Sequence, residues 1–247
     1  TEIADRLGWL DCPENMPGRR EEIEQIVAAI RQDGYTHAIL LGMGGSSLAP
    51  ETFRNIFGIR PGYPELTILD TTDPGAVLAC ARSLDLSRAL FIVATKSGGT
   101  VETFSLMKYF YGQVLAARGW NEAGRHFIAI TDPGSGIAAW AERLRFRHTF
   151  LNDPEIGGRY SALSCFGLVP AALIGMDVKL LLADAAAAAA GTRIDTAAAI
   201  PIDAGSATWH GTPARPEGPY RPESWAAETW SDAAVIGVAL GELARMG

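Results

Sequence analysis

His37-Ala38-Ile39-Leu40-Leu41 is a short apolar run, and Gly42-Met43-Gly44-Gly45-Ser46-Ser47 follows it directly. A continuous apolar run that breaks into glycines is typical of a strand buried in a parallel sheet. A helix is predicted next, from Leu48 to about Phe57. Together the segments predict a strand–loop–helix unit with a glycine-rich loop at the carboxyl end of the strand.

The same unit repeats along the first 150 residues. Further strands are predicted at residues 66–70, 89–94, 127–131 and 148–151, and helices at residues 20–33 and 101–117. Asp73-Pro74 and Asp132-Pro133 each predict the start of another helix, because an N-cap aspartate and a first-turn proline favour initiation. Strands that alternate with helices indicate a parallel sheet covered on both faces. We therefore expect an α/β fold, a three-layer αβα sandwich with a five-stranded parallel sheet.

The rest of the chain is predicted to be mainly helical, with helices at residues 161–174 and 179–190. Residues 203–231 hold four prolines and three tryptophans and predict a long irregular stretch. We expect one domain at residues 1–160 and an extension at 161–247. The chain begins with Thr1 and stops in a predicted helix at residues 241–246, so we expect it to be the N-terminal portion of a longer protein.

Composition excludes several classes of protein. The net charge of −7 disfavours nucleic acid and anionic membranes as bulk partners. The three cysteines and four histidines show no metal-ligand spacing, so we expect no metal and no cofactor. Residues 1–5 lack the basic and apolar regions of a signal peptide, and no apolar run is long enough to cross a membrane, so we expect a cytoplasmic protein.

The loop at residues 42–47 is a candidate anion site. Its glycines let the backbone approach a ligand, and the N–H groups of the following helix point toward an anion. Two serine hydroxyls add hydrogen-bond donors. The alternative is a glycine-rich turn that only connects a strand to a helix.

The loop at residues 95–100, Thr-Lys-Ser-Gly-Gly-Thr, is a second candidate between a strand and a helix. Its three hydroxyls, two glycines and ammonium group suit a phosphate monoester, which presents three acceptor oxygens. The alternative is a helix cap beside a solvated lysine. Two such loops on one sheet favour anion binding, because ligands bind outside the carboxyl ends of parallel strands.

A third element covers residues 152–161, Asn-Asp-Pro-Glu-Ile-Gly-Gly-Arg-Tyr-Ser. Two glycines before Arg159 permit close backbone approach, and the guanidinium could stabilise a developing oxyanion. The alternative is a structural arginine that caps or pairs within the fold.

Two other phosphate motifs do not match. A dinucleotide fingerprint requires a glycine at position 47, which is Ser47, although Asp70 could still meet a ribose. A Walker loop requires a lysine after its glycines, and Lys96 precedes them. A nucleotide-dependent oxidoreductase is a further hypothesis that rests on Asp70; tight NAD binding in calorimetry would rescue it, and we expect none.

Taken together, the motifs at residues 42–51, 95–103 and 155–164 resemble the sugar-isomerase (SIS) domain of the glucose-6-phosphate isomerase family. Residues 3–10 and 160–175 are similar to the isomerase half of bifunctional transaldolase/glucose-6-phosphate isomerases in particular. The resemblance is dense over residues 1–180, fades at 190–233 and returns at 235–247. It implies a SIS or flavodoxin-like sheet, with a second SIS domain after residue 247. It also implies a homodimer of the full-length protein.

The resemblance assigns roles residue by residue. Gly45 and Ser46 correspond to the first phosphate loop, and Arg159 to the arginine that stabilises the enediolate-like intermediate. The second phosphate loop is represented by Thr95, Lys96, Ser97 and Thr100. This loop departs from the family's Ser-Lys-Ser-Gly-Thr-Thr at two positions. Thr95 replaces the first serine and keeps a hydroxyl, whereas Gly99 replaces a threonine and loses one. The loss is expected to weaken phosphate binding somewhat.

The resemblance implies interconversion of glucose 6-phosphate and fructose 6-phosphate through a cis-enediol. In the family a glutamate base, a histidine and a lysine complete the site, and all three are expected after residue 247. Glu102 and Glu155 lie near the loops, but neither matches the family's base. The chain is therefore expected to supply the phosphate site and Arg159. The alternative is a phosphosugar-binding SIS module without catalysis.

Overall fold

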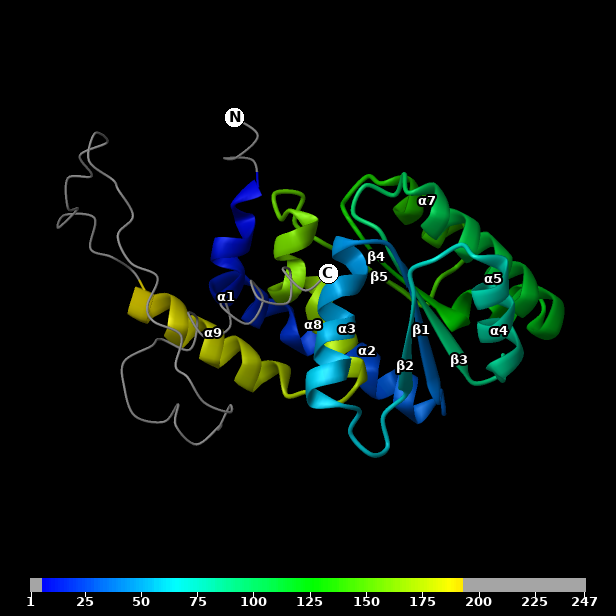
Figure 1. The fold of residues 1–247 in the computed structure, drawn as a ribbon, viewed down its shortest axis with the longest axis horizontal. Helices are drawn as coiled ribbons and strands as arrows, with labels where there is room; N and C mark the ends of the chain where they lie inside the picture. The colour runs from blue at the N-terminus through cyan, green and yellow to red at the C-terminus, as the bar shows by residue number, and fades with distance from the viewer. Residues whose placement is uncertain (1–5, 193–247) are drawn as a thin grey trace, which may run out of the picture. The chain divides into compact units, whose positions relative to one another are not determined.

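A computed structural model describes residues 6–192 of the chain (Figure 1). The chain divides into two compact units, of which the first ends at Ala183 and the second begins at Asp184. The first unit extends further than the predicted domain end at residue 160. The irregular stretch at 203–231, the predicted helix at 241–246 and the first residues of the 3–10 motif lie outside the described residues.

The first unit is built on a five-stranded, entirely parallel sheet in the order β2-β1-β3-β4-β5. The strands are β1 (His37–Gly42), β2 (Glu65–Leu69), β3 (Ala89–Ala94), β4 (Phe127–Thr131) and β5 (His148–Leu151). All five lie where the sequence predicts them to within one residue. The α/β class and the five-stranded parallel sheet are thus confirmed.

Helices connect the strands and continue the chain after β5. The longer ones are α2 (Arg20–Gln32), α3 (Gly45–Phe57), α4 (Pro74–Ser83), α5 (Val101–Arg118), α7 (Gly136–Arg143), α8 (Cys165–Leu173) and α9 (Val178–Thr192). The short ones are η2 (Gly8–Asp11), α1 (Cys12–Asn15), η3 (Met16–Arg19), α6 (Trp120–Ala123), η4 (Gly124–His126) and η5 (Gly158–Leu163).

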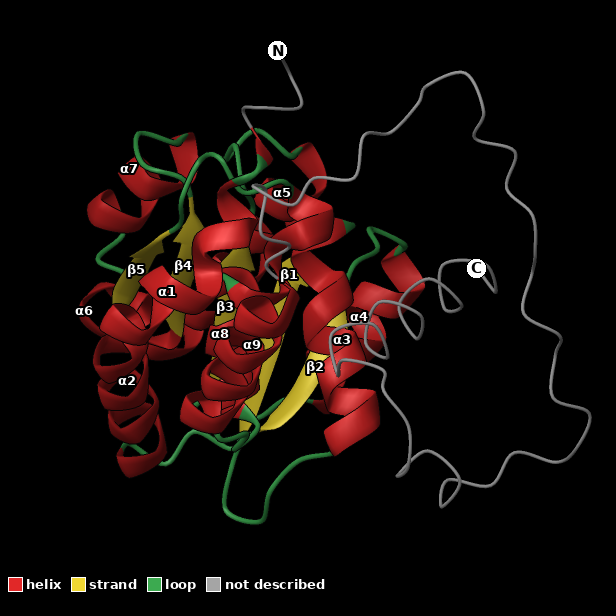
Figure 2. Cartoon of the chain, turned by 90° about the vertical axis from the view of Figure 1, so that its left-hand side faces the viewer, coloured by secondary structure: helices red, strands yellow, loops and turns green. Residues whose placement is uncertain are grey.

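Two apolar layers cover the sheet, because alternate residues of each strand point to opposite faces. Leu40, Ile92 and Ile128 belong to a core shared with α2 and α8, against which Phe53 of α3 also packs. The intervening residues, such as Leu41 and Phe91, pack with α4, α5 and α7. Figure 2 shows α2, α3 and α8 in front of the sheet, while α4, α5 and α7 lie on its other side in Figure 1. This is the predicted three-layer sandwich.

Two helix starts differ from the prediction. Asp132-Pro133 does not begin α7, which starts at Gly136 with the Ser135 hydroxyl accepting from Ala138 N–H. The helix predicted from residue 161 begins at Cys165, where Ser164 accepts from Phe166 N–H, and η5 precedes it. In both cases a serine nearer the helix satisfies its free N–H groups better than the predicted residue. Asp73 does cap α4 as predicted, at 2.8 Å from Ala76 N.

Among residues 6–192, no helix combines the length and apolar character needed to cross a bilayer.

His126 supplies a prediction about stability. Its side chain is buried and its Nδ1 lies 3.0 Å from Ala89 O. Burial lowers the pKa of His126 below its ordinary value of 6.5, because the protonated ring loses solvation. The unfolded chain therefore binds the proton more readily, and His126 should reduce stability as pH falls below about 6.5. Urea unfolding at pH 7.5 and 5.5 measures this loss.

The matched variants are His126→Gln, which should show a smaller loss between the two pH values, and His37→Gln, which should behave like the parent. An equal loss in His126→Gln and the parent would show that the acid sensitivity arises elsewhere.

Candidate functional site

The loops after β1 and β3 lie side by side at the point where the strand order reverses. β1 pairs with β2 on one side and with β3 on the other, and Gly42 is in register with Ala94. The helices that follow β1 and β3 cover opposite faces of the sheet. Such a switch point leaves a crevice at the carboxyl ends of the strands, where ligands of open α/β sheets bind.

In the 42–47 loop, the chain turns directly into α3. Gly44 has a φ of +55°, a backbone conformation that favours glycine. Ser47 is buried, and both its N–H and its hydroxyl donate to Gly44 O at 2.9 Å. The Ser46 hydroxyl, by contrast, has no hydrogen-bond partner among the described residues. Ser47 thus shapes the loop, while Ser46 at the N-terminus of a 13-residue helix is available to a ligand.

In the 95–100 loop, hydroxyls pair with one another instead of capping the helix. Thr95 is buried, and its Oγ1 lies 3.1 Å from Thr100 Oγ1. Thr100 occupies the N-cap position of α5, yet its side chain makes no cap hydrogen bond. Ser97 is exposed and accepts from Gly99 N–H at 3.3 Å. The N-terminus of α5 therefore lies next to the carboxyl end of β3 without a side-chain cap.

The helices that follow the first four strands differ in whether a side chain caps their N-terminus. α4 and α7, which follow β2 and β4, are capped by the side chains of Asp73 and Ser135. α3 and α5, which follow β1 and β3, have no side-chain cap. Uncapped N–H groups and the helix dipole attract an anion. Of these four helices, the two without a side-chain cap are those that begin at the switch point.

Lys96 joins the 95–100 loop to two other segments. Its Nζ lies 2.6 Å from Asp132 Oδ2 and 2.5 Å from Pro154 O. Its carbonyl accepts from Asp132 N–H at 3.0 Å and from Thr131 Oγ1 at 3.2 Å. Burial raises the pKa of the Asp132 carboxyl, although the Lys96 ammonium opposes this effect. The ammonium that the sequence assigns to phosphate is thus already paired with a carboxylate.

The 152–161 segment contacts the 42–47 loop through two glycines. A Cβ atom added to Gly45 would lie 2.4 Å from the carbonyl carbon of Gly158. The Ser161 hydroxyl lies 2.7 Å from Gly158 O and 3.1 Å from Gly45 O. Only glycine at position 45 permits this backbone approach. The 42–47 loop and the 152–161 segment therefore pack directly against each other.

Arg159 follows Gly158 directly in η5 and is exposed. Within residues 6–192 its guanidinium has no hydrogen bond and no ion pair. The adjoining Tyr160 ring stacks on Trp9 at 5.4 Å between centroids. Arg159 is therefore an uncommitted cation held one residue from the wall of the crevice.

The structure thus brings Gly45, Ser46, Thr95, Ser97 and Thr100 to one rim and holds Arg159 beside it. Sequence reasoning missed Asp132 and Ser161, which hold the loops together, because both were assigned to helix starts. A 36-residue separation from Lys96 leaves no local signal for the role of Asp132. In the described part of the chain, no cluster of histidine, cysteine or acidic residues could hold a metal ion.

A family model described as phosphoglucose isomerase matches residues 23–201. A glucose-6-phosphate isomerase of Thermus thermophilus is 35% identical over 185 residues, which cover 73% of this chain and 42% of the relative. One of Rubrobacter xylanophilus is 32% identical over 197 residues, which cover 75% and 44%. The chain spans less than half the length of these curated relatives.

Solved structures show the same similarity. A crystal structure of a hypothetical protein from Thermus thermophilus has a TM-score of 0.71 and 33% identity, covering 77% of this chain and 44% of that one. A glucose-6-phosphate isomerase from Chlamydia trachomatis has a TM-score of 0.62 and 26% identity, covering 70% and 33%. Tagatose-6-phosphate ketose/aldose isomerase from Escherichia coli, with a TM-score of 0.50 and 14% identity, supports the fold alone.

The glycine contact generates a prediction. Gly45→Ala should destabilise the chain by about 1–3 kcal/mol, because the methyl group forces the 42–47 and 152–161 backbones apart. Gly99→Ala is the matched control, since its added Cβ would meet only Ser97 Oγ at 3.6 Å. It should change stability by no more than about 0.5 kcal/mol. Urea unfolding of both variants measures the difference, and equal effects would refute a tight contact at Gly45.

Proposed function

Because the chain belongs to the phosphoglucose isomerase family, we propose that its switch-point rim binds the phosphate of a hexose 6-phosphate. The proposed substrates are glucose 6-phosphate and fructose 6-phosphate. The relatives named glucose-6-phosphate isomerase support this choice. The activity of the whole protein is proposed to be their interconversion through a cis-enediol.

The observation that carries the proposal is the pair of uncapped helix N-termini. α3 and α5 both begin at the crevice without side-chain caps, whereas α4 and α7 beside them are capped. A phosphate accepts hydrogen bonds on three oxygens and carries negative charge, so it satisfies both N-termini at once. A phosphate would take the place of the missing caps.

Individual residues receive proposed roles. Backbone N–H of Gly45 and the hydroxyls of Ser46 and Ser97 donate to the phosphate oxygens. Thr95 and Thr100, whose hydroxyls pair at 3.1 Å, offer the remaining donor at the start of α5. Lys96 adds positive potential, but its pairing with Asp132 makes it chiefly a tie between loops.

Arg159 is proposed to act on the reacting end of the sugar. In aldose–ketose isomerisation a base removes the proton from C2 of the open-chain aldose, and the C1 carbonyl oxygen gains negative charge. The C1 oxygen takes up the proton that the C2 hydroxyl loses, a proton returns to C1, and C2 becomes the ketone carbon. A guanidinium without a carboxylate partner stabilises the developing oxyanion. From the family resemblance, we propose that the base follows residue 247.

A non-catalytic phosphosugar-binding module is the second candidate. One observation favours it: no glutamate near the rim corresponds to the catalytic base of the family. Glu102 and Glu155 are exposed there, but neither matches that base. A general base must lie within hydrogen-bond reach of the proton it removes. Arg159 favours the isomerase, since a binding module does not need a cation at the reacting carbons.

The hydroxyls generate a prediction. Ser46→Ala and Ser97→Ala should each weaken binding of glucose 6-phosphate by ~1–2 kcal/mol, because each removes a hydrogen bond to a charged group. Titration calorimetry measures the change. Ser83→Ala, at the far end of α4 with its hydroxyl on Cys80 O, is the matched control and should leave affinity unchanged. Unchanged affinity in both rim variants would place the phosphate elsewhere.

Turnover is tested separately from binding. The 247-residue chain should bind fructose 6-phosphate but show no appreciable isomerisation in an assay coupled to glucose 6-phosphate dehydrogenase. If the parent chain shows turnover and Arg159→Gln abolishes it, the base lies within this chain. Absence of binding in calorimetry would refute the proposed substrate class.

Three finer expectations remain proposals. The link to a transaldolase domain rests on residues 3–10 and 160–175, and the coding sequence upstream of Thr1 tests it. The homodimer is proposed for the full-length protein, and its mass in solution tests it. We also propose a cytoplasmic location.

A further inference from the structure

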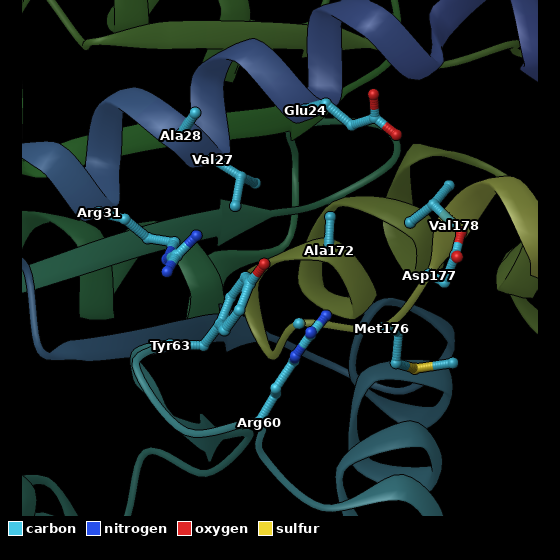
Figure 3. A pocket seen from close by; sticks show the side chains of 11 residues that line it. Glu24, Val27, Ala28, Arg31, Arg60, Tyr63, Ala172, Met176, Asp177 and Val178 are labelled. Carbon is cyan, nitrogen blue, oxygen red and sulfur yellow. The ribbon is translucent and has the colours of Figure 1, made fainter.

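A hollow of about 320 Å³ lies at the edge of the sheet opposite the rim (Figure 3). It is formed by α2, by the turn at residues 60–63 before β2, and by the end of α8 with the residues that follow it. The turn precedes β2 and the end of α2 precedes β1, so the hollow lies at the amino ends of these two strands. It is therefore separate from the proposed phosphate site.

Two arginines gather at one end of this hollow. The guanidinium carbon of Arg31 lies 3.9 Å from the centre of the Tyr63 ring, and its Nε donates to Gly62 O at 3.0 Å. Within the described part of the chain, Arg60 has no side-chain hydrogen bond, and neither arginine is paired with a carboxylate. Figure 3 shows both guanidinium groups near Tyr63.

The acidic residues of the hollow already have partners. Glu24 pairs with Arg20 at 3.1 Å, and Asp177 Oδ1 accepts from Leu180 N–H at 2.9 Å in the first turn of α9. Figure 3 places both carboxylates away from the arginines. Positive charge in the hollow is therefore concentrated at the end formed by Arg31 and Arg60, away from the two carboxylates.

Apolar side chains line the space between the two ends. Val27, Ala172 and Val178 are buried, and Met176 is half-buried. Gly175 has a φ of +87°, and a Cβ added there would lie 2.6 Å from Arg60 Cβ and 2.8 Å from the Tyr63 ring. A glycine at this position lets the 60–63 turn approach the end of α8, which brings Arg60 and Tyr63 to the hollow.

We propose that this hollow binds a small oxyanion carried on a compact apolar group. The guanidinium groups form paired hydrogen bonds with a carboxylate or phosphate, and the ring of Tyr63 keeps that of Arg31 oriented. The apolar wall accepts the rest of the ligand, and the volume suits a molecule of about one ring. The binding does not depend on the proposed isomerase function.

Amide NMR titrations with phenylacetate and with phenyl phosphate test the proposal, and benzyl alcohol is the neutral control. Each anion should shift the amide signals of Gly62, Tyr63 and Gly175, and benzyl alcohol should bind more weakly. A stronger response to one anion identifies the headgroup. Phenyl phosphate can also shift residues 42–47, so Ser46→Ala separates the two sites and should leave the hollow unaffected.

Variants test the two halves of the hollow. Arg60→Gln should raise the dissociation constant for the preferred anion about tenfold, because a charge-assisted hydrogen bond is lost. Ala28→Leu, on an exposed position of α2, should block the apolar part and leave both arginines in place. Arg118→Gln at the end of α5 removes the same charge elsewhere and should change nothing.

The proposal is overturned if neither anion shifts Gly62, Tyr63 or Gly175. It is also overturned if Arg60→Gln and Arg118→Gln weaken binding equally, since a general effect of net charge would then explain the result. Unaltered glucose 6-phosphate affinity in Arg60→Gln is expected, and it separates failure at the hollow from failure at the rim.

Discussion

The parallel pairing of β1 with β3 is the constraint on which the site depends. Because Gly42 is in register with Ala94, the two strands end together and their loops emerge side by side. The following helices lie on opposite faces of the sheet, so their N-termini converge on one crevice from two sides. The loops at residues 42–47 and 95–100 are far apart in the chain, but they contribute to a single rim because β1 and β3 are neighbours in the sheet.

Long-range polar contacts then fix this rim. Ser161 and the Gly45–Gly158 contact join the first loop to the segment after β5. Lys96 joins the second loop to Asp132 and Pro154. The three segments therefore support one another, although none forms regular structure across its whole length. Arg159 is held by the same contacts but is itself free of partners among residues 6–192.

Sequence patterns were sufficient for the fold and for the loops of the candidate site, because strand periodicity and glycine-rich turns are local signals. They were insufficient where a side chain acts at a distance. Asp132 precedes a proline and resembles an N-cap, yet its carboxylate binds Lys96 and Ser135 caps α7. The closeness of Arg159 to the rim depends on Gly45 and Gly158, which are far apart in the chain. No local pattern in the sequence contains these two contacts.

The pairing of Lys96 with Asp132 has a consequence for selectivity. With the Lys96 ammonium neutralised, the phosphate site that we propose at this rim would attract an anion chiefly through the oriented dipoles at the N-termini of α3 and α5. Dipoles act over short distances and only along certain directions. Such a site would distinguish a tetrahedral group of the right size from other anions of equal charge. The selectivity of the proposed site would then be determined by shape.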